Sequence, residues 1–304
     1  MSGKLNIIDK ILKLKKEKNA VILAHNYQIG EVQDIADFVG DSLQLSIEAS
    51  KTKAEMIIFC GVHFMAETAK IISPERKVII PDANAGCPMA DMITAKELKA
   101  LKQKHPDASV VCYVNTSAEV KAISDICCTS SNAVKVVSSI PADREIIFVP
   151  DKYLGSYVSS QTNRKMILWN GYCPTHMLIN SKNIIELKKE HLEALVLVHP
   201  ECRTDVVEIA DRVLSTGQML AFVRQSDSRE FIIGTEIGIL HRMRKENPEK
   251  TFYPALNHAV CPNMKLINTE KILWALEEEK DEVTLPEEII KNARLAIERM
   301  LELK

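Results

Sequence analysis

The stretch Val21-Ile22-Leu23-Ala24-His25-Asn26 is an apolar run that ends in polar side chains. Two more runs of this kind follow it, Val110-Val111-Cys112-Tyr113-Val114-Asn115 and Leu195-Val196-Leu197-Val198-His199-Pro200. Short unbroken apolar runs are typical of strands that are buried on both faces of a parallel sheet. The sequence therefore predicts an internal triplication, in which the first strand of each unit has a polar carboxyl end at His25, Asn115 or His199.

Other landmarks recur at matching places in the three units. Three aspartates are each followed, five residues later, by a hydroxyl residue, which gives the pairs Asp37 and Ser42, Asp125 and Ser130, and Asp211 and Thr216. A second apolar run begins near residues 56, 145 and 231, and a third begins near residues 78, 166 and 251. Each unit is therefore expected to contain three strands that alternate with helices.

Each unit closes on a cysteine followed by a proline, at Cys87-Pro88, Cys173-Pro174 and Cys261-Pro262. Eight cysteines and 12 prolines in 304 residues would give fewer than one such pair by chance. Seven residues beyond each cysteine stands a residue that can cap a helix, namely Thr94, Asn180 and Asn268. A single Cys-Pro pair could simply end a strand, whereas three pairs in register indicate a functional set.

The alternation of short strands with helices predicts an α/β fold of three pseudo-threefold-related α/β/α units with short parallel sheets. The units are expected at residues 1–93 together with the C-terminal residues 268–304, at residues 94–179, and at residues 180–267. Ligands of parallel α/β units bind beyond the carboxyl ends of the strands. The polar strand ends, the hydroxyl residues and the three cysteine loops should therefore converge on one central cavity.

The composition excludes several classes of protein. With 39 basic and 41 acidic residues the net charge is −2, so nucleic acid is not expected as the main partner. The longest apolar runs are far shorter than the roughly 20 residues that span a bilayer, so no membrane helix is expected. The first residues lack the apolar core of a secretory signal, and the expected location is the cytoplasm. In that reducing compartment the cysteines are expected to include metal ligands.

Three thiolates from three separate units fit a [4Fe–4S] cluster better than a structural zinc ion, whose cysteines are usually closely paired along the chain. A cluster with three cysteine ligands leaves one iron open, and that iron can act as a Lewis acid on a substrate atom. The expected ligands are Cys87, Cys173 and Cys261. The remaining cysteines, at positions 60, 112, 127, 128 and 202, are expected to lie in the core.

Several dense motifs together resemble the quinolinate synthase family of de novo NAD biosynthesis. They are Ala24-His25-Asn26-Tyr27-Gln28, Gly40-Asp41-Ser42-Leu43-Gln44, Gly86-Cys87-Pro88-Met89-Ala90-Asp91, Tyr113-Val114-Asn115, Thr129-Ser130-Ser131-Asn132, Gly171-Tyr172-Cys173-Pro174-Thr175-His176, His199-Pro200-Glu201-Cys202, Ser215-Thr216 and Gly234-Thr235-Glu236. The resemblance runs from about residue 4 to residue 302. It implies a triangular α/β enzyme with a central three-cysteine [4Fe–4S] cluster. The implied reaction condenses iminoaspartate (iminosuccinate) with dihydroxyacetone phosphate to quinolinate, with release of phosphate and water.

The resemblance also implies roles for individual residues. Those expected to bind substrate are His25, Ser42, Tyr113, Val114, Asn115, Ser130, His199, Pro200, Glu201, Ser215 and Thr216. Among them, His25, Ser42, His199 and Thr216 would hold the iminoaspartate carboxylates. Tyr27 and Glu201 are the candidates for proton transfer, and His176 is expected near the cluster. With His25 and His199 they form the expected catalytic set.

Two other functions with a similar build stay open at this point. One is a reductive dehydroxylase with a [4Fe–4S] cluster, which would need an external source of electrons. The other is an iron–sulfur sensor, which would need a surface for nucleic acid or a partner protein. The expected partners of the enzyme are its two small-molecule substrates and, transiently, the enzyme that produces iminoaspartate.

Overall fold

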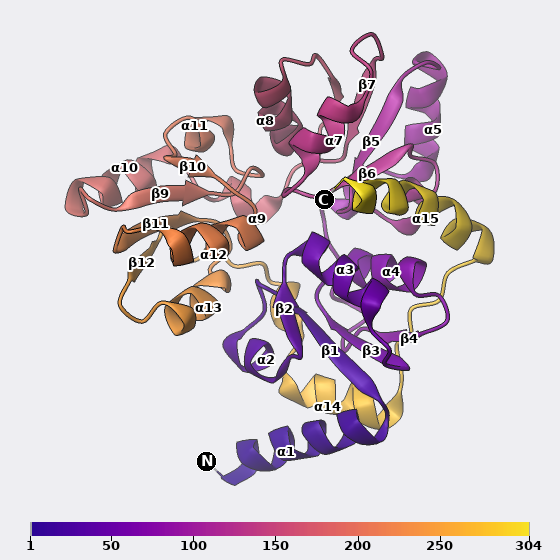
Figure 1. Ribbon diagram of the computed structural model, residues 1–304, viewed down its shortest axis with the longest axis vertical. Helices are drawn as coiled ribbons and strands as arrows, with labels where there is room; N and C mark the ends of the chain where they lie inside the picture. The colour runs from indigo at the N-terminus through magenta and orange to yellow at the C-terminus, as the bar shows by residue number, and fades with distance from the viewer. Residues whose placement is uncertain (1, 304) are drawn as a thin grey trace.

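The computed structural model describes residues 2–303, with side chains described from residue 7 onward. It contains three four-stranded sheets, and every pairing between neighbouring strands is parallel. The three sheets form three lobes around a common centre (Figure 1). The fold class predicted from the sequence, three α/β units with short parallel sheets, is confirmed.

The three units share one topology, in which the first strand lies between the second and the third. The strand orders are β2-β1-β3-β4, β6-β5-β7-β8 and β10-β9-β11-β12. The first unit contains β1 (Ala20–His25), β2 (Phe38–Gly40), β3 (Met56–Cys60) and β4 (Lys77–Ile79), with helices α1 (Ser2–Glu17), α2 (Gly30–Ile35), α3 (Ser42–Lys51) and α4 (His63–Ile72). The second contains β5 (Ser109–Tyr113), β6 (Ile126–Cys128), β7 (Ile146–Val149) and β8 (Ile167–Leu168), with α5 (Ala95–Lys104), α6 (Ala118–Lys121), α7 (Ala133–Ser139) and α8 (Lys152–Thr162). The third contains β9 (Leu195–Val198), β10 (Arg212–Val213), β11 (Glu230–Gly234) and β12 (Thr251–Pro254), with α10 (Ser181–Glu190), α11 (Thr204–Val207), α12 (Thr216–Gln225) and α13 (Ile239–Glu246).

The repeated aspartates each bind the first strand of their unit. The backbone N–H of Ile22 donates to Asp37 at 2.8 Å, that of Val110 to Asp125 at 2.7 Å, and that of Val196 to Asp211 at 2.7 Å. After each aspartate comes a short strand, β2, β6 or β10, that the sequence analysis did not predict. Strands of two or three residues are too short to show a periodic pattern, so the prediction of three strands per unit was one strand too few.

These aspartate contacts also correct the register of the triplication. They make Ile22, Val110 and Val196 equivalent, so the residue equivalent to His25 and His199 is Tyr113. The sequence alignment had placed Asn115 at that strand end and was wrong. The apolar run of the second unit continues into Val114, and no pattern along the chain marks where its strand stops.

The three helix starts predicted after the cysteine loops are confirmed. Thr94, Asn180 and Asn268 are the N-caps of α5, α10 and α14 (Thr269–Glu278). Each side chain accepts a hydrogen bond from the backbone N–H three residues further on. These bonds satisfy donors that the first turn of a helix would otherwise leave unpaired.

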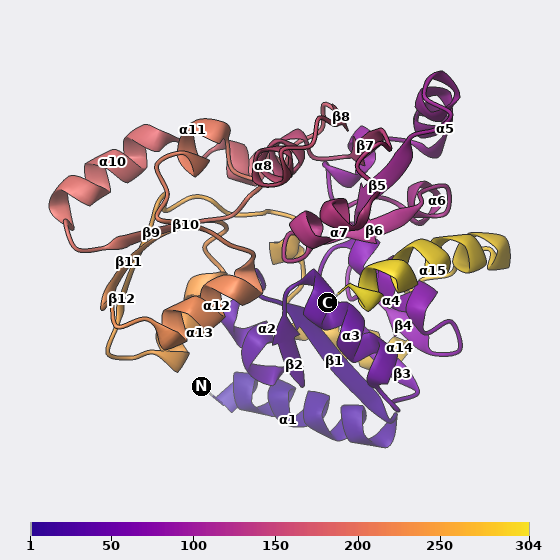
Figure 2. The same cartoon turned by 45° about the horizontal axis from the view of Figure 1, so that its top comes forward.

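The C-terminal segment has two helices with different neighbours. The helix α14 packs against α1 and β3 of the first unit (Figure 1). The helix α15 (Glu287–Glu302) packs against β6 and α6 of the second unit as well as α4 of the first (Figure 2). Arg299 donates to the carbonyl of Asp125 at 2.6 Å, which fixes α15 to the edge of the second sheet.

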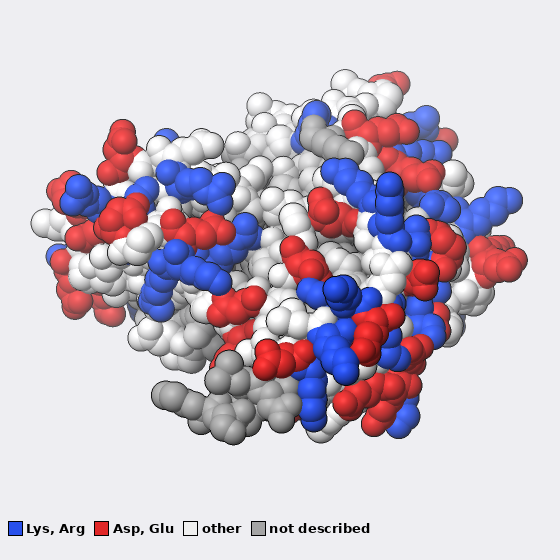
Figure 3. All heavy atoms as spheres, turned by 60° about the horizontal axis from the view of Figure 1, so that its bottom comes forward, with Lys and Arg blue, Asp and Glu red and all other residues white. Residues whose placement is uncertain are grey.

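The surface carries charges of both signs. On the face shown in Figure 3, Lys and Arg side chains lie among Asp and Glu side chains, and the described part of that face has no broad area of one sign. No helix in residues 2–303 is both long enough and apolar enough to cross a membrane.

Candidate active site

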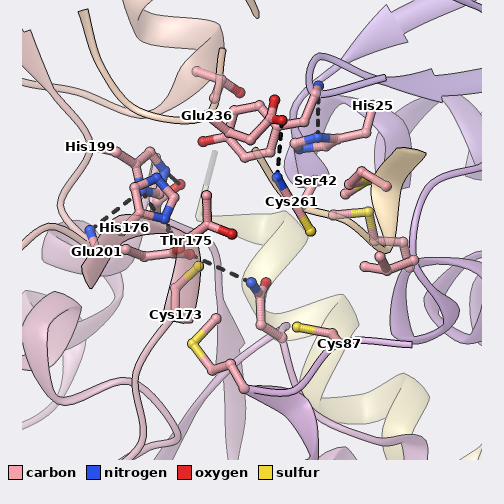
Figure 4. A pocket seen from close by; sticks show the side chains of 18 of the residues that line it. His25, Ser42, Cys87, Cys173, Thr175, His176, His199, Glu201, Glu236 and Cys261 are labelled. Carbon is pink, nitrogen blue, oxygen red and sulfur yellow. Dashed lines mark hydrogen bonds and ion pairs between the residues drawn. The ribbon is translucent and has the colours of Figure 1, made fainter. Parts of the chain in front are cut away.

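A cavity lies where residues from all three units meet (Figure 4). The residues predicted for the site that line it are His25, Tyr27, Ser42, Cys87, Tyr113, Asn115, Ser130, Cys173, His176, His199, Glu201, Thr216 and Cys261. The convergence expected from the strand ends, hydroxyl residues and cysteine loops is therefore what the structure has.

Three residues predicted for the site lie beside this cavity and do not line it. Val114 lines a smaller neighbouring cavity together with Ser42. Pro200 is buried between two residues that do face the cavity. Ser215 is the N-cap of α12, where its hydroxyl accepts from the N–H of Gln218 and donates to Asp41 at 3.2 Å.

Each predicted cluster ligand stands immediately before a short helical turn. Cys173 is the N-cap of α9 (Pro174–Met177), with Pro174 in the first turn. Cys87 precedes the 3-10 helix Ala90–Met92, and Cys261 precedes the 3-10 helix Met264–Leu266. Because the first N–H groups of a helical turn point outward, they favour negative charge on a neighbouring sulfur.

Burial acts on the pKa of all three cysteine thiols. Burial raises the pKa of Cys87 to about 12, although the N–H groups of Ala90 and Met89 oppose it. Burial also raises the pKa of Cys173 and Cys261, again against backbone N–H groups of the following turn, from His176 in one case and from Met264 and Asn263 in the other. A positively charged metal centre is the kind of partner that would deprotonate all three thiols.

Three equivalent loops present the hydroxyl residues Ser42, Ser130 and Thr216. In each loop a side chain accepts the backbone N–H of the residue just before the hydroxyl residue. Gln44 accepts from Asp41 at 3.0 Å, Asn132 from Thr129 at 2.8 Å, and Gln218 from Ser215 at 2.9 Å. This repeated bond gives the three loops the same local structure.

The loops of the first and third units are joined by a buried carboxylate. Asp41 caps α3 by accepting from the N–H of Gln44 at 2.9 Å, and it also accepts from Ser215 at 3.2 Å. Gly217 approaches so closely that a Cβ there would lie 2.5 Å from Asp41 Oδ2. Burial raises the pKa of Asp41, and hydrogen bonds from Gln44, Ser215 and Gly217 counteract that rise.

His25 and His199 are neutral and share one tautomer. Burial lowers the pKa of His25 and of His199 to about 3. In each ring Nδ1 accepts a backbone N–H two residues further on, from Tyr27 at 3.2 Å and from Glu201 at 3.3 Å. The hydrogen therefore sits on Nε2, which for His199 lies 3.2 Å from the hydroxyl of Ser130. Both rings can thus donate a hydrogen bond to an anionic ligand.

Glu201 is the most densely bonded group of the site. Its Oε1 accepts from the Tyr113 hydroxyl at 2.5 Å, and its Oε2 lies 2.9 Å from His176 Nδ1. Burial alone would raise the pKa of Glu201, but the nearby rings of His176 and His199 and the Tyr113 hydroxyl outweigh it and lower the pKa to about 2. Glu201 is therefore ionised. The ligand atoms of Cys173, His176 and Glu201 lie within 4.8 Å of one another, a group that suits a metal ion.

Some lining residues were not predicted as site residues. They are Asp41, Val62, Phe64, Met65, Met89, Thr175, Glu236 and Met264. Glu236 accepts from the N–H of Cys261 at 3.1 Å and lies 2.9 Å from Lys265, so it holds the third cysteine loop. Its contacts join segments about 25 residues apart, which a single sequence does not reveal.

A buried cavity at the carboxyl ends of parallel strands, lined by sulfurs, imidazoles and an ionised carboxylate, defines an α/β enzyme with a central active site. Residues 9–302 match the family model described as quinolinate synthetase A protein. A quinolinate synthase of Dehalococcoides mccartyi is 57% identical over 295 residues, which cover 97% of both chains. Proteins named quinolinate synthase from Thermodesulfovibrio yellowstonii and quinolinate synthase 1 from Methanosarcina acetivorans are 53% and 52% identical, and each alignment covers at least 97% of this chain and 98% of the relative. This chain belongs to the quinolinate synthetase A family.

Proposed function

We propose that the chain condenses iminoaspartate with dihydroxyacetone phosphate to form quinolinate, with release of phosphate and water. The observation that carries the proposal is the convergence of three cysteine sulfurs with paired hydroxyls and imidazoles in one cavity. The names of its relatives support the product, because each relative is called a quinolinate synthase.

Cys87, Cys173 and Cys261 suit a [4Fe–4S] cluster. They are soft ligands from three separate loops, and backbone N–H groups face each sulfur. All three sulfurs face the same space in Figure 4. When bound there, a cluster with three cysteine ligands would supply a Lewis acid at its open iron for the loss of a substrate hydroxyl. His176 and Glu201, next to Cys173, would fix the surroundings of that ligand.

The hydroxyl loops are suited to the carboxylates of iminoaspartate. Ser42 and Thr216 are the first residues of α3 and α12, where the peptide dipoles favour an anion. His25 and His199 add neutral N–H donors, which hold a carboxylate without the cost of burying a further charge. Ser130, beside His199, completes the binding wall.

Tyr27 and Glu201, which both line the cavity, are suited to proton transfer. Burial, followed by the charge of Glu201, raises the pKa of Tyr27 well above its ordinary value, so its phenol is a hydrogen-bond donor or proton donor at neutral pH. Glu201 is ionised and can accept a proton. A condensation that closes an aromatic ring needs several proton shifts, and an acid and a base in one cavity serve them.

The instability of iminoaspartate suggests a protein partner, and the cysteines suggest a cellular location. Iminoaspartate hydrolyses readily in water, so we propose a transient contact with the enzyme that produces it. All eight cysteines are free in the described part of the chain, which suits a reducing cytoplasm.

The deciding experiment is an assay of protein reconstituted without oxygen to a known iron and sulfide content. The protein is given dihydroxyacetone phosphate and freshly generated iminoaspartate, with no reductant, and quinolinate is measured by mass spectrometry. Product that depends on the cluster supports the condensation, because the reductive dehydroxylase would require electrons and a sensor would form no product. A full cluster without product would contradict the proposal.

The cysteine assignment has its own test. Alanine at Cys87, Cys173 or Cys261 should abolish cluster binding, because each removes one ligand. Alanine at Cys60 or Cys202, which are buried in the core, should leave the iron content unchanged. Iron and sulfide analysis with the visible spectrum checks both sets, and a full cluster in Cys173→Ala would refute the ligand assignment.

A further inference from the structure

We infer that Asn132 is a positioning residue that ties the loop at residues 129–132, called here the Ser130 loop, to the last turn of α15, an inference that rests on the proposed function. The loop carries Ser130, which lines the cavity and lies 3.2 Å from His199 Nε2. Asn132 is 5% exposed and does not line the cavity. It would therefore act on substrate binding only through the placement of Ser130.

The Ser130 loop is the exception among the three hydroxyl loops. Ser42 and Thr216 are the first residues of α3 and α12, so a helix fixes each of them directly. Ser130 instead stands in a turn, and α7 begins three residues later, at Ala133. The backbone around Ser130 therefore depends on side-chain contacts for its support.

Asn132 supplies this support from within the loop. Its side-chain oxygen accepts from the backbone N–H of Thr129 at 2.8 Å and from the Thr129 hydroxyl at 3.2 Å. Its amide nitrogen donates to the carbonyls of Met300 at 3.4 Å and Leu303 at 3.5 Å. Because a helix leaves its last carbonyls without partners along its own backbone, the end of α15 offers acceptors to this buried amide. One side chain thus closes the Ser130 loop and binds it to α15.

The helix α15 is held tightly enough to serve as an anchor. It lies between the first and the second lobe in both Figure 1 and Figure 2, where it contacts α4, α6 and β6. Four of its side chains are completely buried, namely Ala293, Ala296, Ile297 and Met300. Arg299 donates to the carbonyl of Asp125 just before β6, and β6 leads directly into the Ser130 loop.

A further contact reaches the Ser130 loop from the third unit. Gln218 donates to the carbonyl of Ser131 at 3.1 Å, and this bond is exposed to solvent. The bond from Asn132 to Met300 is buried. Since a buried polar group without a partner is more costly than an exposed one, we expect Asn132 to contribute more than Gln218 to the placement of the loop.

The substitution Asn132→Asp isolates the bond to α15. An aspartate keeps an oxygen that can accept from Thr129, but it places a second oxygen against two carbonyls that need a donor. In cluster-loaded enzyme we expect Asn132→Asp to raise KM for iminoaspartate about 10-fold, with kcat within about 3-fold of wild type. The reason is that Ser130 is displaced while Tyr27 and Glu201 keep their places.

A matched control comes from another buried asparagine at the end of a helix. Asn247 is 3% exposed, and its amide nitrogen donates to the carbonyl of Met243 in α13 at 3.0 Å. It does not line the cavity. Asn247→Asp therefore measures the general cost of this substitution at a buried helix end. We expect its KM to stay within about 3-fold of wild type, with iron and sulfide content unchanged in both aspartate variants.

Hydrogen exchange gives a readout that does not depend on the reaction. The backbone N–H groups of Asn132 and Ala133 both donate to the carbonyl of Thr129. They should exchange about 10-fold faster in Asn132→Asp than in wild type, and at the wild-type rate in Asn247→Asp. Arg299→Met loosens α15 from the opposite side without changing the Ser130 loop itself. It should also speed the exchange of the same two N–H groups.

Several results would overturn the inference. A wild-type KM in Asn132→Asp would do so, as would an equal rise of KM in Asn247→Asp. Wild-type exchange of the Ser130 loop in both Asn132→Asp and Arg299→Met would show that the loop does not depend on α15. If Asn132→Asp does not fold, exchange in Arg299→Met decides alone. If the wild type makes no quinolinate, the proposed function fails, and the exchange measurements still decide the role of Asn132.

Discussion

The side chains of the cavity divide into charged and neutral groups by their partners. Glu201 stays ionised because three neighbours bind or face its oxygens, whereas His25 and His199 stay neutral because burial acts on them with little compensation. A bound dicarboxylate would therefore meet neutral donors at His25 and His199 and a fixed negative charge at Glu201. That distribution favours one orientation of the substrate.

The first prediction concerns the two proton-transfer candidates. Tyr27→Phe and Glu201→Gln should both keep the full cluster, because neither residue is among the three cysteine ligands. Turnover should fall about 100-fold or more in each, as expected for the loss of a general acid or base. Iron and sulfide analysis checks the cluster content, and the quinolinate assay checks turnover. Wild-type rates in both variants would contradict the proposed roles.

Much of the site was predictable at this scale, because the triplication marks Ser42, Thr216, His25, His199 and the cysteines without any structure. Their contacts were not predictable. Asp41 lies in a recognisable motif, yet it accepts a hydrogen bond from Ser215, which is 174 positions away along the chain. Such pairings depend on how the units pack together, and no local pattern carries that information.

Within each unit, the repeated aspartate binds the first strand and stands directly before the second. The second prediction is that Asp211→Ala leaves the N–H of Val196 unpaired in a buried strand and lowers the free energy of unfolding by about 1 to 3 kcal/mol. The melting temperature should fall by several degrees, as should that of Asp37→Ala and Asp125→Ala. Asp107→Ala, at an exposed turn, is the control and should leave the melting temperature nearly unchanged. Equal melting temperatures for Asp211→Ala and the control would contradict this role.

The third prediction concerns the end of α14. Glu279 binds Lys18 and Lys77, and the hydrogen bonds from these lysines lower the pKa of Glu279 to about 2. A carboxyl whose pKa is lower in the folded state stabilises the fold above its ordinary pKa of about 4.5, and this contribution disappears as the pH falls toward 2. Glu279→Gln should therefore lower the melting temperature by about 1 to 3 °C at pH 7.

The pH series supplies the check on Glu279. The difference in melting temperature between wild type and Glu279→Gln should shrink steadily between pH 5 and pH 3. Since both proteins are measured in parallel, acid effects on the rest of the molecule cancel. A difference that stays constant over this range would mean that the lysine contacts do not stabilise the charged form.

At the level of helices and strands, long periodic segments were predictable and short ones were not. The helices after the cysteine loops begin where their capping residues predicted. The strands β6 and β10 have three and two residues, too few to show a periodic pattern, and each follows the aspartate that binds the first strand of its unit. The position of α15 depends on contacts with both the first and the second unit, so its sequence alone did not assign it to one of them.

For the molecule as a whole, a close approach between the first and third units bears directly on the site. Gly217 faces Asp41 with no room for a Cβ, and the neighbouring residues Ser42 and Thr216 both line the cavity. The fourth prediction is that Gly217→Ala separates these two loops and lowers kcat/KM about 10-fold or more, since small displacements of binding groups are costly. Steady-state kinetics at unchanged iron content check this. A wild-type kcat/KM would mean that Asp41 moves aside without consequence.

The threefold repetition of the strand order has a consequence for ancestry. Three identical copies of one such unit would assemble as a trimer around a threefold axis. The three walls of the pocket between them would then be identical. The present walls keep a cysteine in each unit, at Cys87, Cys173 and Cys261, but differ at other equivalent points. Tyr113 stands where the other two units have His25 and His199, and Tyr27, Asn115 and Glu201 stand two residues further on. When the three units belong to one chain, the sequence of each unit can change independently of the other two. Quinolinate has no threefold axis, and fusion of the copies is what allows such a scaffold to recognise an asymmetric molecule.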